Sequence, residues 1–147
     1  MKKKYLFIIP IIIIVLIILI IVNNPKDEEY YVLKDDKIKS ITSLLGERKL
    51  TRKTKKKYND TIIKTYKYKK IKSPSIDLSK YIIYLENESN FMTTKEYNLN
   101  NEKGTLQLSR YSTEKSYIIL IDISYNKNSY TIKITRGKGK ITPLNNS

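Results

Sequence analysis

An unbroken apolar run from Tyr5 to Val22 constrains this chain more than any other feature of its sequence. As a helix rising about 1.5 Å per residue, its 18 residues would span roughly 27 Å, close to the ~30 Å hydrocarbon core of a bilayer. Pro10 falls in the first two turns, where the loss of one backbone hydrogen bond is tolerated. We therefore predict a transmembrane helix over residues 5–22, preceded by a short basic tail at 1–4.

A cleaved secretory signal and a retained anchor are the two interpretations of this run. The apolar part of a signal peptide usually has about 7 to 15 residues and ends in small residues at the cleavage site. This run is longer and is followed by Asn23, Asn24 and Pro25, which favours a retained signal-anchor. The chain contains no cysteine that an acyl chain could modify, which excludes a lipoprotein.

Basic residues beside the span predict its orientation. Three lysines precede it at residues 2–4, whereas Lys26 is the only basic residue among the first ten that follow, and acidic residues occupy positions 27–29. Basic residues are retained on the cytoplasmic side of a membrane. We therefore expect a single-pass protein of the cell membrane, with a cytoplasmic N-terminus and an extracytoplasmic C-terminal domain.

The composition excludes several kinds of chemistry. Histidine and cysteine are absent, so the chain has no Ser-His-Asp or Cys-His pair, no zinc site of the usual kind and no disulfide. Serine and lysine are plentiful, but no spacing singles out a catalytic pair. We expect a non-enzymatic protein with no catalytic residues, no metal site and no cofactor. The outline is similar to that of many bacterial surface proteins, a likeness of composition that carries no function.

The residues after the span are expected to form one α+β domain. Apolar residues at 38, 41, 44 and 45 share one helical face before Gly46, which predicts a helix over 35–45 capped by Asp35 or Asp36. Apolar residues at 78, 81, 82 and 85 predict a second helix from Asp77 to about Glu88, capped by Ser75, Asp77 or Ser79. The expected divisions are a tail at 1–4, an anchor at 5–22, a juxtamembrane segment at 23–34, an α+β ectodomain at 35–136 and a flexible tail at 137–147.

Alternating sequence patterns predict the strands. Residues 48–57 and 61–71 flank the turn-like triplet Tyr58-Asn59-Asp60 and are expected to form a hairpin. Further strands are expected at 91–98, 104–111, 116–125 and 129–136, and the last two are predicted to supply the core through alternate tyrosines and isoleucines. Short connections require antiparallel pairing, so we predict an antiparallel sheet with one or two helices covering one face. The order of the strands stays open.

Positive charge is concentrated in 25 residues of this domain. Residues 48–72 carry twelve basic side chains and one acidic one, Asp60, out of a net charge of +15 for the whole chain. The abundance of lysine over arginine, 25 to 4, matches the codons of an A- and T-rich genome and explains part of this charge. The basic cluster consists of Arg48, Lys49, Arg52, Lys53, Lys55, Lys56, Lys57, Lys64, Lys67, Lys69, Lys70 and Lys72.

Three interpretations of the basic cluster remain open. Lysines on an edge strand protect it against aggregation. They also attract anionic surfaces, here anionic lipid or a cell-wall polymer. Tyr58, Tyr66 and Tyr68 alternate with lysines in a way that suits base stacking, although four arginines and an extracytoplasmic location argue against nucleic acid.

The leading hypothesis is a membrane-anchored extracytoplasmic binding or structural protein whose basic hairpin at 48–72 contacts anionic membrane or cell-wall polymer. The first alternative is an accessory subunit that packs on another membrane protein through its apolar helix and sheet face. The second, with the opposite topology, is a cytoplasm-facing domain that binds nucleic acid. Asp122 lies among isoleucines, but alternation places it opposite the core as a solvated or salt-bridged strand residue.

Overall fold

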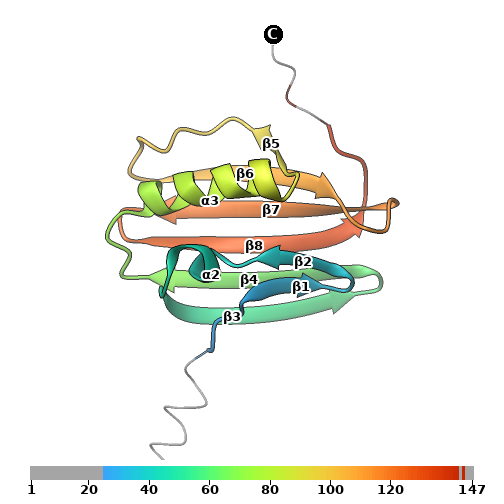
Figure 1. Ribbon diagram of the computed structural model, residues 1–147, viewed down its shortest axis with the longest axis horizontal. Helices are drawn as coiled ribbons and strands as arrows, with labels where there is room; N and C mark the ends of the chain where they lie inside the picture. Colours follow the sequence, from blue (N-terminus) through green and yellow to red (C-terminus); the bar gives the residue numbers. More distant parts are fainter. Residues whose placement is uncertain (1–24, 143, 145–147) are drawn as a thin grey trace, which may run out of the picture.

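The computed structural model describes residues 25–142 and residue 144. They form a small α+β domain with two antiparallel sheets and two helices (Figure 1), which confirms the predicted fold class of this part of the chain. The predicted tail at 1–4 and transmembrane helix at 5–22 lie outside the described residues. Within the described residues, no helix has the length and apolar character needed to cross a membrane.

Six strands form the larger sheet, and every neighbouring pair is antiparallel. They are β3 (Lys49–Tyr58), β4 (Thr61–Lys69), β5 (Met92–Lys95), β6 (Gly104–Tyr111), β7 (Tyr117–Asn126) and β8 (Ser129–Lys138). Their order is β3-β4-β8-β7-β6-β5. The sheet therefore joins the β3–β4 hairpin to a β5–β8 meander, with β4 beside β8, an order that periodicity does not reveal.

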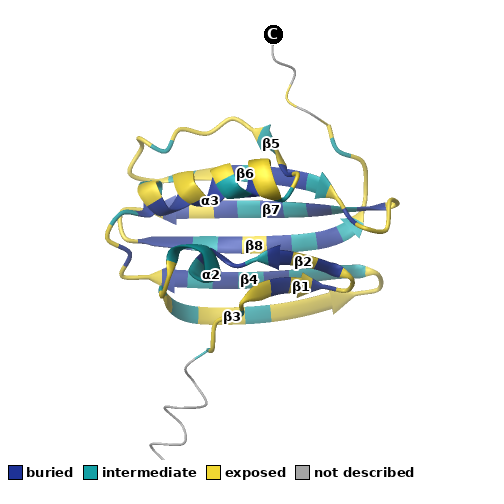
Figure 2. Cartoon of the chain, viewed as in Figure 1, coloured by how far each residue is buried: buried dark blue, intermediate teal, exposed yellow. Residues whose placement is uncertain are grey.

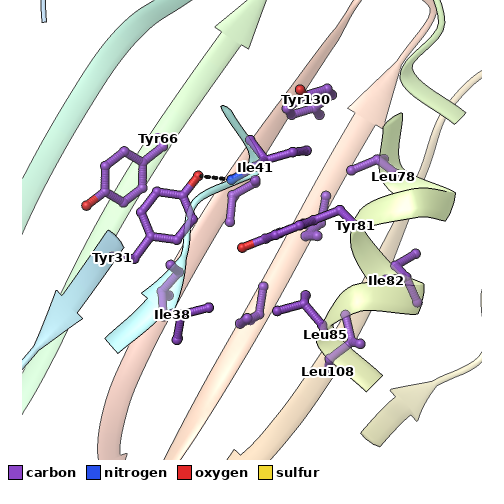
Figure 3. Close-up of a cluster of buried hydrophobic side chains, with 14 of the residues drawn as sticks. Tyr31, Ile38, Ile41, Tyr66, Leu78, Tyr81, Ile82, Leu85, Leu108 and Tyr130 are labelled. Atoms are coloured by element: carbon purple, nitrogen blue, oxygen red, sulfur yellow. Dashed lines mark hydrogen bonds between the residues drawn. The ribbon is translucent and has the colours of Figure 1, made fainter. Parts of the chain in front are cut away.

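One face of this sheet is covered by the rest of the domain (Figure 1). The covering elements are α3 (Pro74–Glu88), the short helix α2 (Ile41–Leu45) and the hairpin of β1 (Tyr30–Leu33) and β2 (Asp36–Lys39). The apolar face of α3 is buried as its spacing predicted, and the predicted core rows of β7 and β8 are buried with it. Figure 3 shows Tyr81 of α3 and Tyr31 of β1 within this core.

The helix predicted over residues 35–45 is wrong in its first half. Residues 36–39 form β2 and pair with β1, with Tyr31 opposite Ile38. Ile38 fits a strand as well as a helix, and pairing with β1 decides between them. The cap is Ser40, whose Oγ accepts a hydrogen bond from Ser43 N at 3.1 Å, rather than Asp35 or Asp36. Gly46 ends the helix as predicted, with φ of 85°.

Other boundaries also differ from the predicted ones, mostly by one or two residues. Helix α3 begins at Pro74, because a proline at the first helical position sacrifices no intrahelical hydrogen bond. Asp77 is therefore inside the helix rather than capping it, and neither Ser75 nor Ser79 is the cap. Strand β5 ends at Lys95, and β8 continues to Lys138 where a flexible tail was expected, because its last residues still pair with β7.

Candidate anionic-surface interface

The predicted hairpin at 48–72 is present as β3 and β4, and β3 forms an edge of the six-stranded sheet (Figure 1). The turn between them is Asn59-Asp60, where Asn59 has φ of 50°, a left-handed conformation that asparagine tolerates. Strand β3 carries six basic side chains and no acidic one. Most of its residues are exposed along the whole strand (Figure 2).

The basic side chains of β3 point to both faces of the sheet. Lys53, Lys55 and Lys57 lie on the side of the covered face, and Arg52 and Lys56 lie on the uncovered face, as their pairing with β4 shows. Three pairs of like charge lie directly opposite each other: Lys49 with Lys69, Arg52 with Lys67, and Lys55 with Lys64. Such pairs are unfavourable, so the pairing of β3 is maintained against electrostatic repulsion.

Three members of the basic cluster hold the fold together. The guanidinium of Arg48 binds Asp77 through Nε to Oδ2 at 2.6 Å and Nη2 to Oδ1 at 2.9 Å. Lys53 and the buried Lys64 both contact the carboxylate of Glu28, at 2.6 and 3.2 Å. The nine others form no ion pair among the described residues: Lys49, Arg52, Lys55, Lys56, Lys57, Lys67, Lys69, Lys70 and Lys72.

Two of the three tyrosines in the hairpin are buried, so they cannot stack on bases. The Tyr66 hydroxyl donates to Glu28, and the Tyr68 hydroxyl donates to Asp27 Oδ1 at 3.1 Å. Burial, and then the neighbouring carboxylate, raise the pKa of Tyr66. Tyr58 is 61% exposed, which leaves one accessible tyrosine where the sequence suggested three.

The segment before β1 is part of the domain rather than a linker. Glu28 is bonded to β3 and β4 as described above, and the Glu29 carbonyl accepts from Ser40 N at 2.9 Å. Pro25 and Lys26 line a shallow hollow together with Lys49 at the start of β3. The predicted juxtamembrane segment at 23–34 therefore contains structured residues from at least Glu28 onward, and β1 lies within it.

Replacing Glu28 by glutamine is expected to lower the free energy of unfolding by about 1–3 kcal/mol, because Lys64 would stay buried without a counter-charge. Burial alone would raise the pKa of Glu28, but hydrogen bonds from Lys53, Tyr66 and Lys64 outweigh it and lower the pKa. The stabilisation is therefore present above pH 4.5, the ordinary glutamate pKa, and is lost as the pH falls through the lower pKa of the folded state.

Urea unfolding of Glu28→Gln and wild-type protein at neutral pH measures this effect. The control is Glu29→Gln, a change of the same charge at an exposed side chain, expected to stay within about 0.5 kcal/mol of wild type. The Glu28 variant should also lose less stability than wild type on acidification below pH 4.5. Equal effects of the two variants would contradict this account of Glu28.

A second buried ionic cluster, on the same face of the sheet as Lys64, was missed by sequence reasoning. Asp36 and Arg136 are each 2% exposed, and Arg136 Nε lies 3.5 Å from Asp36 Oδ2. The Asp36 carboxylate also accepts from Ser112 Oγ and from the Thr113 N–H at 3.1 Å. The cluster ties the β1–β2 turn to the β6–β7 loop. One feature of the sequence indicates this cluster: Arg136 follows Ile132 and Ile134 at alternate positions of β8, so its side chain points to the same buried face.

Asp122 lies on the uncovered face, as predicted. Its carboxylate is 3.6 Å from Lys133 Nζ and accepts from Gln107 Nε2 at 2.8 Å. These contacts make it a partly solvated, salt-bridged strand residue. In the part of the chain that the structure describes, no three acidic residues gather closely enough to hold a metal ion.

Comparisons of the chain with protein-family models, with curated proteins and with solved structures find no match.

Proposed function

We propose that this protein is a single-pass, membrane-anchored, non-enzymatic binding or structural protein. Its α+β domain lies outside the cytoplasm and uses the β3–β4 hairpin to contact an anionic surface, either lipid head groups or a cell-wall polymer. The observation that supports the proposal best is the edge strand β3, where Lys49, Arg52 and the consecutive Lys55, Lys56 and Lys57 are exposed and form no ion pair among the described residues.

The composition of this strand suits a charged surface better than a nucleic acid. Lysine is a compact point charge that is attracted to any dense anionic surface, whereas reading base edges or stacking on bases relies on arginine and aromatic faces. Strand β3 has one arginine, Arg52, and the hairpin exposes one tyrosine, Tyr58. Cytoplasmic nucleic-acid binding is therefore the weaker proposal, and it requires the opposite topology.

Protease shaving of intact cells stripped of their wall, followed by mass spectrometry, tests the location. Peptides from residues 26–147 should be released while the segment at 1–22 stays in the membrane. Protection of the domain until lysis would place it in the cytoplasm and contradict the proposal.

The binding step is tested by adding the domain of residues 26–147 to anionic vesicles and to anionic wall polymer, where salt-sensitive binding to one of them is expected. Indifference to both would contradict the hairpin's proposed role.

A second candidate function is an accessory subunit that packs on another membrane protein. The apolar face of α3 is occupied by the domain's own core, so it is not available for this purpose. The uncovered face of the sheet carries the half-buried side chains of Ile63, Ile118 and Leu120, which favour such a contact. Co-purification with one stoichiometric partner at high salt supports this candidate, since apolar contacts do not weaken as ionic strength rises.

A further inference from the structure

The domain begins very close to the end of the apolar run. Three peptide units separate Val22 from Pro25, and a fully extended chain covers at most about 11 Å over that distance. Charges interact appreciably over a Debye length of about 8 Å at physiological ionic strength. If residues 5–22 span a membrane, Pro25 and the elements beside it lie within or just beyond the reach of the head-group charges.

The segment that starts at Pro25 is attached to one side of the domain. Glu28 contacts Lys53 at 2.6 Å, Asp27 accepts from Tyr68 at 3.1 Å, and Pro25 and Lys26 line a hollow with Lys49. In Figure 1 the first described residues leave the domain beside β3, across the edge of the sheet rather than along its strands. These contacts fix the place where the chain enters the domain, which lies beside β3, so β3 is on the side from which the chain leads back to the apolar run.

The side that faces the anchor is also the most basic edge of the domain. Glu28, the acidic residue bonded to β3, is neutralised by Lys53 and Lys64, and Asp60 at the hairpin turn lies 3.8 Å from Lys138. Glu47 lies beside the start of β3 and offsets one of its charges. The consecutive Lys55, Lys56 and Lys57 remain unpaired among the described residues, along an edge that Figure 2 shows exposed.

We propose that the β3 edge lies against the anionic lipid head groups of the same membrane in which the chain is anchored. This inference rests on the proposed function and selects lipid over wall polymer as the surface that the hairpin contacts. A polymer further from the membrane would face the opposite edge of the sheet, where β5 and β6 lie. The lysines of β3 without an ion pair among the described residues, Lys49, Lys55, Lys56 and Lys57, then reach the head groups through their flexible methylene stems, while the strand backbone stays above them.

The test uses the full chain in vesicles and exploits its lack of cysteine. One fluorophore is attached through Thr54→Cys in β3, and in a second sample through Thr105→Cys in β6, four strands or about 19 Å away across the sheet. The vesicles contain phosphatidylcholine, with or without phosphatidylglycerol, and a lipid with a nitroxide on its head group. With phosphatidylglycerol, quenching at position 54 should be several-fold stronger than at 105, and the contrast should shrink without it or at high salt.

Charge variants in the Thr54→Cys background show whether β3 causes the contrast. Changing Lys55, Lys56 and Lys57 to glutamate should abolish it. The matched control changes Lys80, Lys103 and Lys115 to glutamate, three exposed lysines outside β3 and β4, and should leave it intact.

Other outcomes separate failure of the inference from failure of the proposed function. Equal quenching at positions 54 and 105 would overturn the inference that the β3 edge faces the lipid head groups. If the same chain resists alkaline extraction from the vesicles, the proposed membrane anchor is retained. If that chain also binds wall polymer in a salt-sensitive way, the proposed function holds with wall polymer, rather than lipid, as the anionic surface. Loss of the chain from the vesicles on alkaline extraction would overturn the anchor and this inference together.

Discussion

Replacing Asp36 by alanine is expected to lower the free energy of unfolding by about 3–5 kcal/mol, among the largest effects of any single substitution in this domain. The carboxylate is 2% exposed, and it accepts hydrogen bonds from Ser112, Thr113 and Arg110 beside the buried guanidinium of Arg136. The substitution leaves the Arg136 charge buried with Glu114 as its remaining acidic partner, at 2.6 Å. It also leaves the exposed ion pair of Lys34 with Glu114, at 3.0 Å, to join the β1–β2 turn to the β6–β7 loop.

Urea or thermal unfolding at neutral pH measures this loss. The neighbouring variant Asp35→Ala removes the same charge from an exposed side chain and should change stability by no more than about 0.5 kcal/mol. A similar small change in Asp36→Ala would show that the buried cluster contributes little to folding.

The pH dependence of stability should also show the contribution of the Asp36 cluster. Burial alone would raise the pKa of Asp36, but hydrogen bonds from Ser112 and Thr113, together with the charge of Arg110, outweigh it and lower the pKa. The stabilisation is therefore complete above pH 3.8, the ordinary aspartate pKa, and is lost as the pH falls through the lower pKa of the folded state. The free energy of unfolding of Asp36→Ala should therefore fall less than that of the wild type as the pH is lowered below 3.8.

Changing Lys55, Lys56 and Lys57 together to glutamate is expected to weaken binding of residues 26–147 to anionic vesicles by at least about 100-fold. Each lysine near an anionic membrane contributes about 1 kcal/mol, so loss of three costs about 3 kcal/mol, and the introduced acidic groups add repulsion. The three side chains are exposed and form no ion pair among the described residues, so stability should change little. Residues 26–147 contain every helix and strand that the structure describes.

Vesicle sedimentation at low ionic strength measures this binding. The control variant, with glutamate at Lys80, Lys103 and Lys115, has the same net charge but leaves β3 intact, and should bind within a few-fold of wild type. Equal weakening by both variants would show that net charge, rather than the position of β3, governs the interaction.

The sequence predicts the hairpin of the candidate site but not which of its basic side chains are free to bind a partner. The twelve basic residues at 48–72 are read directly from the sequence, and the hairpin that carries them was predicted correctly from alternation and turn residues. Which of these residues are available was not predictable, because Arg48 is bound by Asp77, 29 residues away, and Lys64 by Glu28, 36 residues away. Tyr66 and Tyr68 looked like exposed partners of the lysines, and both are buried against β1 and the segment before it.

The sequence by itself determined the apolar run at 5–22, the exclusion of histidine and cysteine chemistry, and the strands β6, β7 and β8. These follow from local pattern, since period-two alternation specifies a strand with one buried face whatever its neighbours are. Only the tertiary structure decided that residues 36–39 are a strand, that β4 lies beside β8 and that Asp36 meets Arg136. Each of these depends on a partner distant in the chain, and a long-range pairing leaves no periodic signal in either segment alone.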